Sequence, residues 1–580
     1  MQLGFHRASR ERIPCRSRVR QVRWRDGSLV PNAPARGGWS TRMNETDTFD
    51  FIVVGAGSAG AAAAVRLAQA AKHRVLLLEA GPPDTSFWSR IPIGVGTLLA
   101  KGIYIRDFFT EPDPQLNSRR IYWPRGWVVG GCSTVNGMMW VHGTPREYDL
   151  WAQDGCPGWG WADLAHWFRK IENYAKGDPM YRGLNGPVGV TEFQPVDEGP
   201  DAFLDALQAS GVGKRVRDYN AGGIGGSYVQ FNTRRGLRSS MREAYLDPNK
   251  GLPNLTIMTG VLATRVLTQG KHACGIVARA EGRELTLHAR KEVILCGGTF
   301  NSAQLLELSG IGRREVLDAA GIPLLHELPM VGENLSEHVY SPITFRCKPG
   351  ISWNRRLNSP IGKLLDGARW LLRRDGRLTS ATMTAHGFVP HNPADNNAQI
   401  KLQLQQASAP GNRGKSMTRL DSFDGVTLAS FQISPYSRGS CHIANADPAA
   451  APKLISNHFT DPRDIETSLV ALRKLRQVAS AAPLARWLLE ELRPGRRAMS
   501  DEALIEYMRA TSATAYHPVG TCRMGADTSQ SVVDPWLRVH GVSGLRVADC
   551  SIMPSIASTN TNALAIVIGE RVAEFALADA

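Results

Sequence analysis

The chain has 580 residues, of which 43% are hydrophobic and 21% are charged. This composition is typical of a globular protein long enough for two domains, and no run of about 18 apolar residues predicts a membrane-spanning helix. Of the net charge of +15, residues 1–42 contribute +8 through ten Arg and two acidic residues, which leaves 15 − 8 = +7 for residues 43–580. Because this remainder is spread without a dense basic block, it favours a mildly basic enzyme over a nucleic-acid binder.

The nine cysteines are widely separated along the chain, and no two of them form a C-x-x-C pair. Their spacing predicts neither a disulfide framework nor a zinc site, and we expect no bound metal. Free thiols fit a reducing compartment, so we expect a cytoplasmic protein, with peripheral contact to a membrane as an open alternative.

Residues 1–42 are rich in Arg and lack the apolar stretch of about 7–15 residues that a secretory signal contains. Three interpretations are open: a transit-like peptide, a disordered basic arm, and a chain whose translation begins at Met43. We favour the third. In each case residues 1–47 form a basic extension, disordered or not translated, that is set aside from the fold.

A short buried strand at residues 49–54 opens the predicted fold. It runs into the sequence GAGSAG at residues 55–60, and an Ala-rich helix with small residues follows. Residues 74–78 predict a second buried strand, which ends at Glu79. Strand, glycine loop, helix and strand together predict one βαβ unit of about 30 residues.

The glycine loop has the G-x-G-x-x-G spacing of a dinucleotide-binding site. Gly55 permits the tight turn, Gly57 lets the backbone approach a pyrophosphate, and Gly60 lets the helix touch the strand. The helix N-terminus offers free N–H groups to phosphates. Glu79 lies 24 residues after Gly55, where a carboxylate can accept a hydrogen bond from a ribose hydroxyl.

Further along the chain, helices and strands follow without an internal repeat. Residues 82–160 are rich in Gly, Pro and Trp, and we expect mostly long loops there. A buried strand at residues 292–296 leads into a helix that Asn301 or Ser302 caps and that stops at Gly310. Other helices are predicted at residues 161–175, 201–211, 463–480, 501–511 and from about Thr561, and other strands at residues 255–266, 273–280 and 426–434.

Six segments carry a resemblance to a known family. They include GWVVGGCSTVNGMM, GTFNSAQLLELSGIG and HPVGTCRMG, and they keep one order along the chain. Together they resemble the glucose–methanol–choline (GMC) oxidoreductases, and the likeness is closest to choline-dehydrogenase-like and alcohol-dehydrogenase-like members. The six segments lie at residues 126–139, 298–312, 331–338, 435–448, 517–525 and 546–571.

The resemblance implies an α/β fold. A Rossmann-like FAD-binding domain is expected to be interleaved with an α+β substrate-binding domain that contains an antiparallel sheet. The expected boundaries are residues 48–150, 222–335 and 510–580 for the FAD-binding domain, and residues 151–221 and 336–509 for the substrate-binding domain.

The resemblance also implies the cofactor contacts. The glycine loop and Glu79 would hold the ADP part of FAD, Ala263 would touch the adenine edge, and Asp549 would lie near the ribityl chain and the pyrophosphate. Members that attach FAD covalently carry a His where this chain has Val135, so we expect dissociable FAD. The expected cofactor-binding residues are Gly55, Gly57, Ser58, Ala59, Gly60, Glu79, Gly130, Gly131, Ser133, Asn136, Gly137, Ala263, Asp549 and Asn562.

Oxidation of an alcohol to a carbonyl needs a base for the hydroxyl proton and an acceptor for the hydride, and flavin is such an acceptor. His517 resembles the catalytic base of the family, and imidazole, with an ordinary pKa of about 6.5, suits that role. Asn560 matches the second active-site position and would donate a hydrogen bond to the alcohol oxygen. The helix predicted from Thr561 would direct its N-terminus at the flavin and favour an anionic reduced ring.

The substrate pocket is expected to include Tyr516, Tyr340 and Trp140, and His338 is expected to be structural. Tyr340 stands where choline-acting members carry an acidic residue, and residues 384–388 lack the Glu of a related family pattern. We therefore expect FAD-dependent oxidation of an uncharged primary alcohol to the aldehyde, by a dehydrogenase rather than an oxidase.

Four alternatives remain open: an alcohol oxidase that uses oxygen, a choline dehydrogenase, a cyanohydrin lyase of the same fold, and a catalytically inactive FAD-binding protein. Bleaching of the flavin by an alcohol without oxygen would separate an oxidoreductase from the last two. The sequence does not identify the electron acceptor, which could be a quinone, a dye-like carrier or oxygen, or the oligomeric state.

Overall fold

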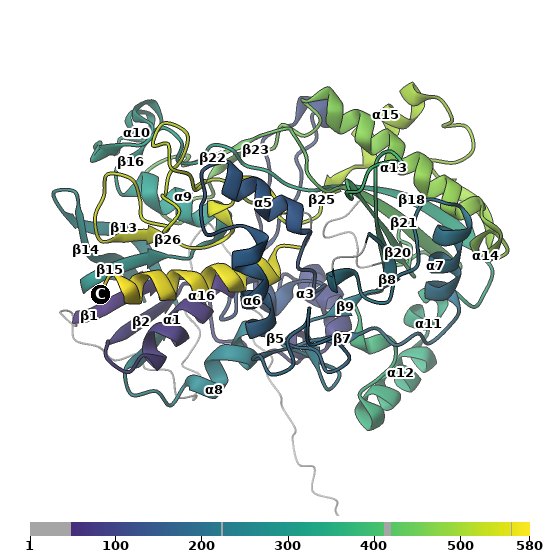
Figure 1. The fold of residues 1–580 in the computed structure, drawn as a ribbon, viewed down its shortest axis with the longest axis horizontal. Helices are drawn as coiled ribbons and strands as arrows, with labels where there is room; N and C mark the ends of the chain where they lie inside the picture. Colours follow the sequence, from purple (N-terminus) through teal and green to yellow (C-terminus); the bar gives the residue numbers. More distant parts are fainter. Residues whose placement is uncertain (1–47, 222–223, 411–418, 558–559) are drawn as a thin grey trace, which may run out of the picture. The chain divides into compact units, whose positions relative to one another are not determined.

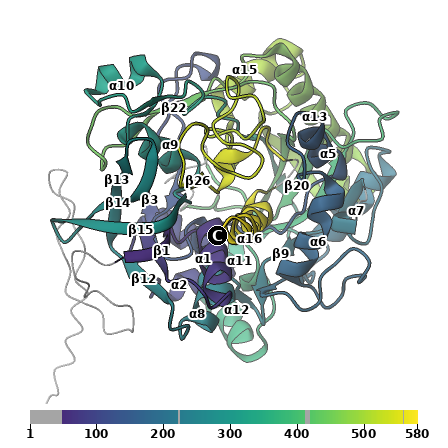
Figure 2. The same ribbon diagram turned by 60° about the vertical axis from the view of Figure 1, so that its left-hand side comes forward.

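The computed structural model describes residues 48–221, 224–410, 419–557 and 560–580, so the expectations for residues 1–47 lie outside the described residues. Figures 1 and 2 show two large groups of strands with helices packed around them. Each group is a seven-stranded sheet.

The predicted βαβ unit forms the centre of the first sheet. Strands β1 (Thr48–Val54) and β2 (Val75–Glu79) pair in parallel, and α1 (Ser58–Gln69) connects them. The other neighbour of β1 is β15 (Arg283–Leu295), which is also parallel to it. Parallel strands covered on both faces bury every side chain, which explains why Phe51 to Val54 and all of β2 are buried.

The remainder of the first sheet is mixed. Strand β12 (Leu255–Thr259) pairs in parallel with β2, and β26 (Leu545–Val547) pairs in parallel with β15. Strands β13 (Val261–Gln269) and β14 (His272–Ala280) extend the sheet in antiparallel order. The first sheet is therefore assembled from three separate parts of the sequence.

Two helices bring distant residues to the end of this sheet. Helix α16 (Asn562–Ala578) packs so closely on α1 that a Cβ at Gly569 would lie 2.1 Å from the Ala59 carbonyl oxygen. Helix α9 (Gly298–Leu308) begins before the predicted caps Asn301 and Ser302, so that prediction was wrong. The Ser302 hydroxyl instead donates a hydrogen bond to Asp549, which ties this helix to the C-terminal segment.

The second sheet is antiparallel, and its two faces differ. One face carries apolar side chains that form a core with α13 (Pro462–Ser480) and α7 (Gly199–Ala209). The opposite face carries polar and aromatic side chains, including Lys401 and Phe431, which are paired across strands. The strand order is β24 (Leu488–Arg493), β18 (Val339–Cys347), β21 (Gly425–Gln432), β20 (Ile400–Gln405), β19 (Met383–Val389) and β8 (Gly225–Tyr228), with β25 (Ala513–Thr514) also on β18.

The predicted α/β fold with an antiparallel second sheet is confirmed. The domain boundaries stay a prediction. Strands β8 and β25, which those boundaries assign to the FAD-binding domain, pair in the second sheet. Residues 225–228 and 513–514 therefore contribute strands to the second sheet, although they lie in ranges expected for the FAD-binding domain.

Residues 82–160, expected to be mostly loops, contain several short helices. The first of them, Phe87–Arg90, is capped by the Ser86 hydroxyl, which accepts a hydrogen bond from the Trp88 amide. None of the helices in the described ranges has the length and apolar character that a membrane crossing requires. The short helices are α2 (Phe87–Arg90), α3 (Val95–Lys101), α4 (Cys132–Val135) and α5 (Pro145–Gln153).

Candidate active site

A cavity of about 750 Å³ runs from the glycine loop of the first sheet to the polar face of the second. Val54 and Leu78 line it at the ends of β1 and β2, and Gln403 and Phe431 line it on the second sheet. This volume is within the range of cofactor and ligand sites in proteins, about 300–1,000 Å³. The ends of the cavity differ in what lines them.

At one end, the glycine loop has the backbone that the sequence predicts. Gly55 has a φ of +104°, and a Cβ there would lie 2.4 Å from the Cys296 carbonyl oxygen. A Cβ at Gly60 would lie 1.9 Å from the Gly55 carbonyl oxygen. At Gly57, by contrast, no atom lies within 4 Å of the added Cβ, because this glycine faces the open cavity. Two glycines thus shape the turn, and the third leaves space for a ligand.

Glu79 ends β2 at the wall of the cavity. Its carboxylate accepts hydrogen bonds from the backbone amides of Ala56 (2.9 Å) and Gly81 (2.8 Å). Burial raises the pKa of Glu79 to about 7, and those amides oppose the shift. The side chain is thereby held beside the glycine loop, where a ribose hydroxyl would be expected.

Asp549 and Asn562 close this end from the C-terminal segment. Asp549 accepts hydrogen bonds from the Gly298 amide (2.9 Å) and the Ser302 hydroxyl (2.6 Å), so it fixes the start of α9. The Asn562 side-chain oxygen accepts a hydrogen bond from the Ser58 hydroxyl (2.7 Å). Its buried Nδ2 has no partner among the described residues and lines the cavity at the start of α16.

These observations fit FAD. The open space at Gly57, at the N-terminus of α1, suits a pyrophosphate, and the unpartnered Asn562 amide is a donor for a flavin carbonyl. Among the predicted cofactor residues, those that line this one cavity are Gly55, Gly57, Ser58, Ala59, Glu79, Gly131, Asn136, Gly137, Ala263, Asp549 and Asn562.

Other predicted residues lie behind the cavity wall. Gly60, Gly130 and Ser133 support the wall, and the Ser133 hydroxyl donates to the Gly130 carbonyl oxygen at 2.6 Å. Trp140, expected in the substrate pocket, is buried in the core instead, where its indole N–H donates to Glu172. Tyr340 is buried against Phe431 rather than in the lining. Local motif spacing does not distinguish a lining side chain from one that supports it.

At the other end of the cavity, the two predicted catalytic side chains meet. His517 and Asn560 both line it, and Asn560 Nδ2 lies 2.8 Å from His517 Nε2. The other atom of the amide, Oδ1, accepts a hydrogen bond from Lys401 Nζ at 2.8 Å. Because an ammonium can only donate, this contact assigns the amide orientation and presents the Asn560 N–H group to His517.

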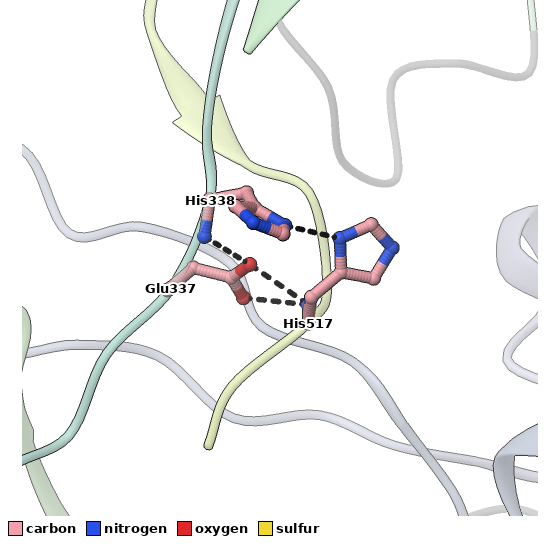
Figure 3. Close-up of side chains that lie close together, drawn as sticks. All are labelled: Glu337, His338 and His517. Carbon is pink, nitrogen blue, oxygen red and sulfur yellow. Dashed lines mark hydrogen bonds between the residues drawn. The ribbon is translucent and has the colours of Figure 1, made fainter. Parts of the chain in front are cut away.

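A second hydrogen bond fixes the proton on the other side of the His517 ring. His338 Nε2 lies 2.7 Å from the Ile433 carbonyl oxygen, which can only accept, so the proton of His338 is on Nε2. Its free Nδ1 lies 3.0 Å from His517 Nδ1, as the dashed line between the two rings in Figure 3 shows. His517 therefore donates from Nδ1, and its Nε2 lone pair is directed at Asn560.

Burial keeps His338 neutral. Desolvation lowers the pKa of His338 to about 3, the hydrogen bond to Ile433 opposes that shift, and the positive charge of Lys401 adds to it. A neutral imidazole has one donor and one acceptor nitrogen, as the contacts of this ring require. These contacts give His338 a specific structural role, because they determine which nitrogen of His517 carries the proton.

Glu337 anchors the backbone that carries both histidines. Its carboxylate accepts hydrogen bonds from the amides of His338 and His517 (2.8 Å each), from the Trp123 indole (2.7 Å) and from the Thr514 hydroxyl (2.5 Å). Burial raises the pKa of Glu337 to about 7 against these donors. Ligand atoms of Glu337, His338 and His517 lie within 4.8 Å of one another, a spacing that a metal ion could use. Their hydrogen-bond partners instead describe a scaffold for His517.

Lys401 and Glu337 were not among the residues that sequence analysis selected. Lys401 lies in β20, more than 150 residues before Asn560, and only strand register brings it to the Asn560 side chain. Glu337 lies inside VGENLSEH, so the segment was noted but the role of its carboxylate was not. The alternation of apolar and polar residues in β20 (IKLQLQ) indicates that Lys401 faces away from the apolar core, and no comparable local pattern indicates Glu337.

Comparisons with known proteins agree with this architecture. The GMC oxidoreductase family models match residues 49–340 and 435–569. An uncharacterized GMC-type oxidoreductase of Mycobacterium bovis is 38% identical over 535 residues, which cover 90% of this chain and 98% of the relative. An oxygen-dependent choline dehydrogenase of Photobacterium profundum is 35% identical, over 91% of this chain and 92% of its own.

Among solved structures, the fold is similar to that of pyridoxine 4-oxidase from Mesorbium loti. The TM-score is 0.81 at 27% sequence identity, over 90% of this chain and 98% of that one. The two family models together match more than half of the chain, and these relatives align over 90% or more of it. The chain therefore belongs to the GMC oxidoreductase family.

Proposed function

We propose that the protein binds FAD dissociably and oxidises an uncharged primary alcohol to the aldehyde, with His517 as the base. The observation that carries the proposal is the directed chain of hydrogen bonds from Lys401 through Asn560 and His517 to His338. It leaves an unprotonated Nε2 on His517, next to a hydrogen-bond donor, in the lining of the cavity. A base and a donor side by side suit an alcohol oxygen.

In this proposal the alcohol oxygen replaces the direct hydrogen bond between His517 Nε2 and Asn560 Nδ2 and contacts both atoms. The hydroxyl proton moves to Nε2, and the Asn560 amide stabilises the charge that develops on oxygen. The C–H bond breaks as a hydride leaves, and a C=O bond forms. FAD, when bound, supplies the acceptor for that hydride. His338 holds the imidazole in the tautomer that can take the proton.

The charges at the end of the cavity that holds His517 and Asn560, here named the reaction end, support a neutral substrate. The Lys401 ammonium is buried, lies 2.8 Å from the Asn560 oxygen, and is 5.6 Å from the ring centroids of Phe388 and Phe431. Among the described lining residues, the acidic side chains are Glu79 and Asp549, both at the nucleotide end. A quaternary ammonium about 7 Å from Lys401 would be disfavoured by about 2 kcal/mol at an effective dielectric constant near 20, roughly 30-fold.

Dissociable FAD and a dehydrogenase rather than an oxidase complete the proposal. Val135 lines the cavity and has no nucleophilic atom to bond the flavin. Precipitation with acid should release the yellow chromophore into the supernatant, whereas a chromophore retained in the pellet would contradict dissociable binding. Reoxidation of the reduced flavin should be faster with an artificial quinone than with oxygen.

The substrate class is tested with two alcohols of the same shape. Choline and 3,3-dimethylbutan-1-ol differ in one atom, a charged nitrogen in place of a carbon. Anaerobic stopped-flow mixing with the FAD-loaded protein should bleach the flavin at least tenfold more efficiently with the neutral alcohol. Bleaching by neither would favour a lyase or an inactive FAD-binding protein, and faster bleaching by choline would overturn the neutral substrate.

Substitution of Lys401 separates charge from shape. Lys401→Met keeps the length of the side chain but removes the charge, so the preference for 3,3-dimethylbutan-1-ol over choline should fall at least fivefold. Lys401→Arg, which keeps the charge, should retain the preference. An unchanged ratio in Lys401→Met, with normal flavin content, would show that Lys401 does not select against cations.

A further inference from the structure

Helix α12 (Pro360–Arg373) is fixed to the protein by one face. Its N-terminus is capped by the Ser359 hydroxyl, which accepts a hydrogen bond from the Gly362 amide. Asp366 is buried and pairs with Arg356, and the Trp370 indole donates to the Gly236 carbonyl oxygen at 2.8 Å. Gly362, Asp366 and Trp370 recur every four residues, so they define the inner face of the helix.

The outer face of the same helix is apolar and exposed to solvent. Leu364 and Leu372 are 71% and 85% exposed, and Ile361 is 70% exposed. With Leu365 and Leu371 they occupy about 120° of the helix circumference, directly opposite the inner face. A helix on the surface of a soluble protein normally has its apolar face inward and its polar face toward solvent. A contiguous exposed apolar patch marks an interaction site.

Three basic side chains on or next to α12 have no carboxylate partner among the described residues: Lys363, Arg373 and Arg374. Residues 351–380 contain seven Arg or Lys and two acidic residues, but four of the seven basic side chains pair with carboxylates: Arg355 with Asp424, Arg356 with Asp366, Arg369 with Asp375 and Arg377 with Asp197. Of the two acids, Asp366 is buried in the inner face and Asp375 is paired with Arg369. Lys363 and Arg373 are exposed on the helix itself, and Arg374 lies over the Trp370 ring at 4.2 Å.

Two aromatic side chains extend the patch beyond α12. Phe87 is 57% exposed and lies edge-on to Trp370, with ring centroids 6.4 Å apart, and Trp88 beside it is also exposed. Both belong to α2. Exposed Trp and Phe beside leucines and basic residues are the composition of a surface that enters the headgroup region of a bilayer.

The patch adjoins the cavity along the chain at two places. Leu357, in α11 (Asn354–Asn358) immediately before α12, lines the cavity. Ile93 and Val95, which follow α2, line it as well. Figures 1 and 2 both show α12 at the lower edge of the ribbon, and Figure 1 shows α11 next to it. A membrane in contact with α12 and α2 would therefore face the part of the molecule that borders the cavity.

We infer that the outer face of α12, with Phe87 and Trp88, docks on the surface of an anionic phospholipid bilayer. The apolar stripe supplies the inserted surface, and the basic residues match anionic headgroups, at about 1 kcal/mol for each Lys or Arg close to the membrane. Since one amphipathic helix and weak electrostatic attraction act together, the attachment is peripheral and reversible. Such docking gives apolar molecules dissolved in the bilayer a short path to the cavity.

Vesicle sedimentation tests the inference with the FAD-loaded full chain. At low ionic strength the protein should sediment with vesicles of phosphatidylcholine and phosphatidylglycerol (7:3), and at least fivefold less with phosphatidylcholine alone. Leu364→Glu together with Leu372→Glu should reduce binding at least tenfold. Lys363→Gln together with Arg373→Gln should reduce it severalfold and weaken its dependence on salt.

Leu489→Glu is the matched control, because Leu489 is also an exposed leucine, in β24. Flavin content and circular dichroism check that each variant is folded, and Leu364→Ser with Leu372→Ser replaces the Glu pair if that pair misfolds. Equal sedimentation of the control and the α12 variants would overturn the inference. The inference would also be overturned if the wild-type protein did not bind vesicles but formed a dimer that the α12 substitutions dissociate. In that case the outer face of α12 would bind a second copy of the chain.

Discussion

The two ends of the cavity are built in different ways. At the nucleotide end, the backbone of one local motif does the work: Gly55 turns the chain, Gly57 leaves space, and Glu79 is held by two amides. At the reaction end, side chains from distant strands and loops form one chain of hydrogen bonds through His517 and Asn560. On the proposed function, this difference predicts that cofactor affinity depends on the shape of the backbone, whereas catalysis depends on which nitrogen of each histidine carries the proton.

If that contrast holds, loss of the imidazole should leave the flavin in place. His517→Ala should slow anaerobic flavin reduction by an alcohol by roughly 100-fold or more, because a general base contributes about 10²–10⁴-fold to rate. FAD content should remain normal, since the nucleotide end is untouched. Stopped-flow absorbance of the flavin measures the rate. Reduction within threefold of the wild-type rate would exclude His517 as the base.

A substitution at the nucleotide end of the cavity should remove the flavin and leave the fold intact. Gly57→Val adds a side chain whose Cβ has no atom within 4 Å and which enters the space expected for the pyrophosphate. We expect FAD affinity to fall about 100-fold, equivalent to about 3 kcal/mol of overpacking, with an unchanged circular dichroism spectrum. Gly251→Val is the control, because its Cβ would also meet no atom within 4 Å but lies outside the cavity lining. Normal FAD binding by Gly57→Val would contradict the assignment.

A smaller effect should come from His338, which acts through His517. His338→Leu removes the acceptor at Nδ1 and should slow flavin reduction roughly tenfold, with a changed pH dependence of the rate. His338→Gln can still donate to Ile433 and accept from His517, so it should recover most of the rate. Equal rates and identical pH profiles in both variants would reduce His338 to a packing role.

A separate prediction concerns stability at acid pH. Burial lowers the pKa of His338 to about 3 from an ordinary value of 6.5, so below pH 6.5 the unfolded chain binds a proton that the folded chain does not. This part of the stability is present in full above pH 6.5 and is lost as the pH falls toward 3, by about 1.4 kcal/mol per pH unit. In urea unfolding followed by fluorescence, His338→Gln should lose that much less per unit between pH 6 and pH 4. Parallel slopes would contradict the shifted pKa.

The difference between the two ends of the cavity also explains which residues could be predicted from the sequence. The glycine loop, Glu79 and α16 were predicted because their function follows from local spacing and strand or helix periodicity. Lys401 was not, because its approach to Asn560 depends on the register of β20 within the second sheet. Trp140 lies next to a predicted flavin segment, yet its hydrogen bond to Glu172 draws it into the core. The sequence shows which residues are neighbours along the chain, but only packing in the fold determines which of them line the cavity.

A crystal structure of the FAD-loaded protein with a non-reactive alcohol analogue tests the central claim most directly. We predict that His517 Nε2 and Asn560 Nδ2 both lie within hydrogen-bond distance of the analogue oxygen, with its carbon against the flavin ring, and that His517 Nδ1 keeps its contact with His338. An analogue bound elsewhere, or a flavin ring distant from His517 and Asn560, would contradict the account.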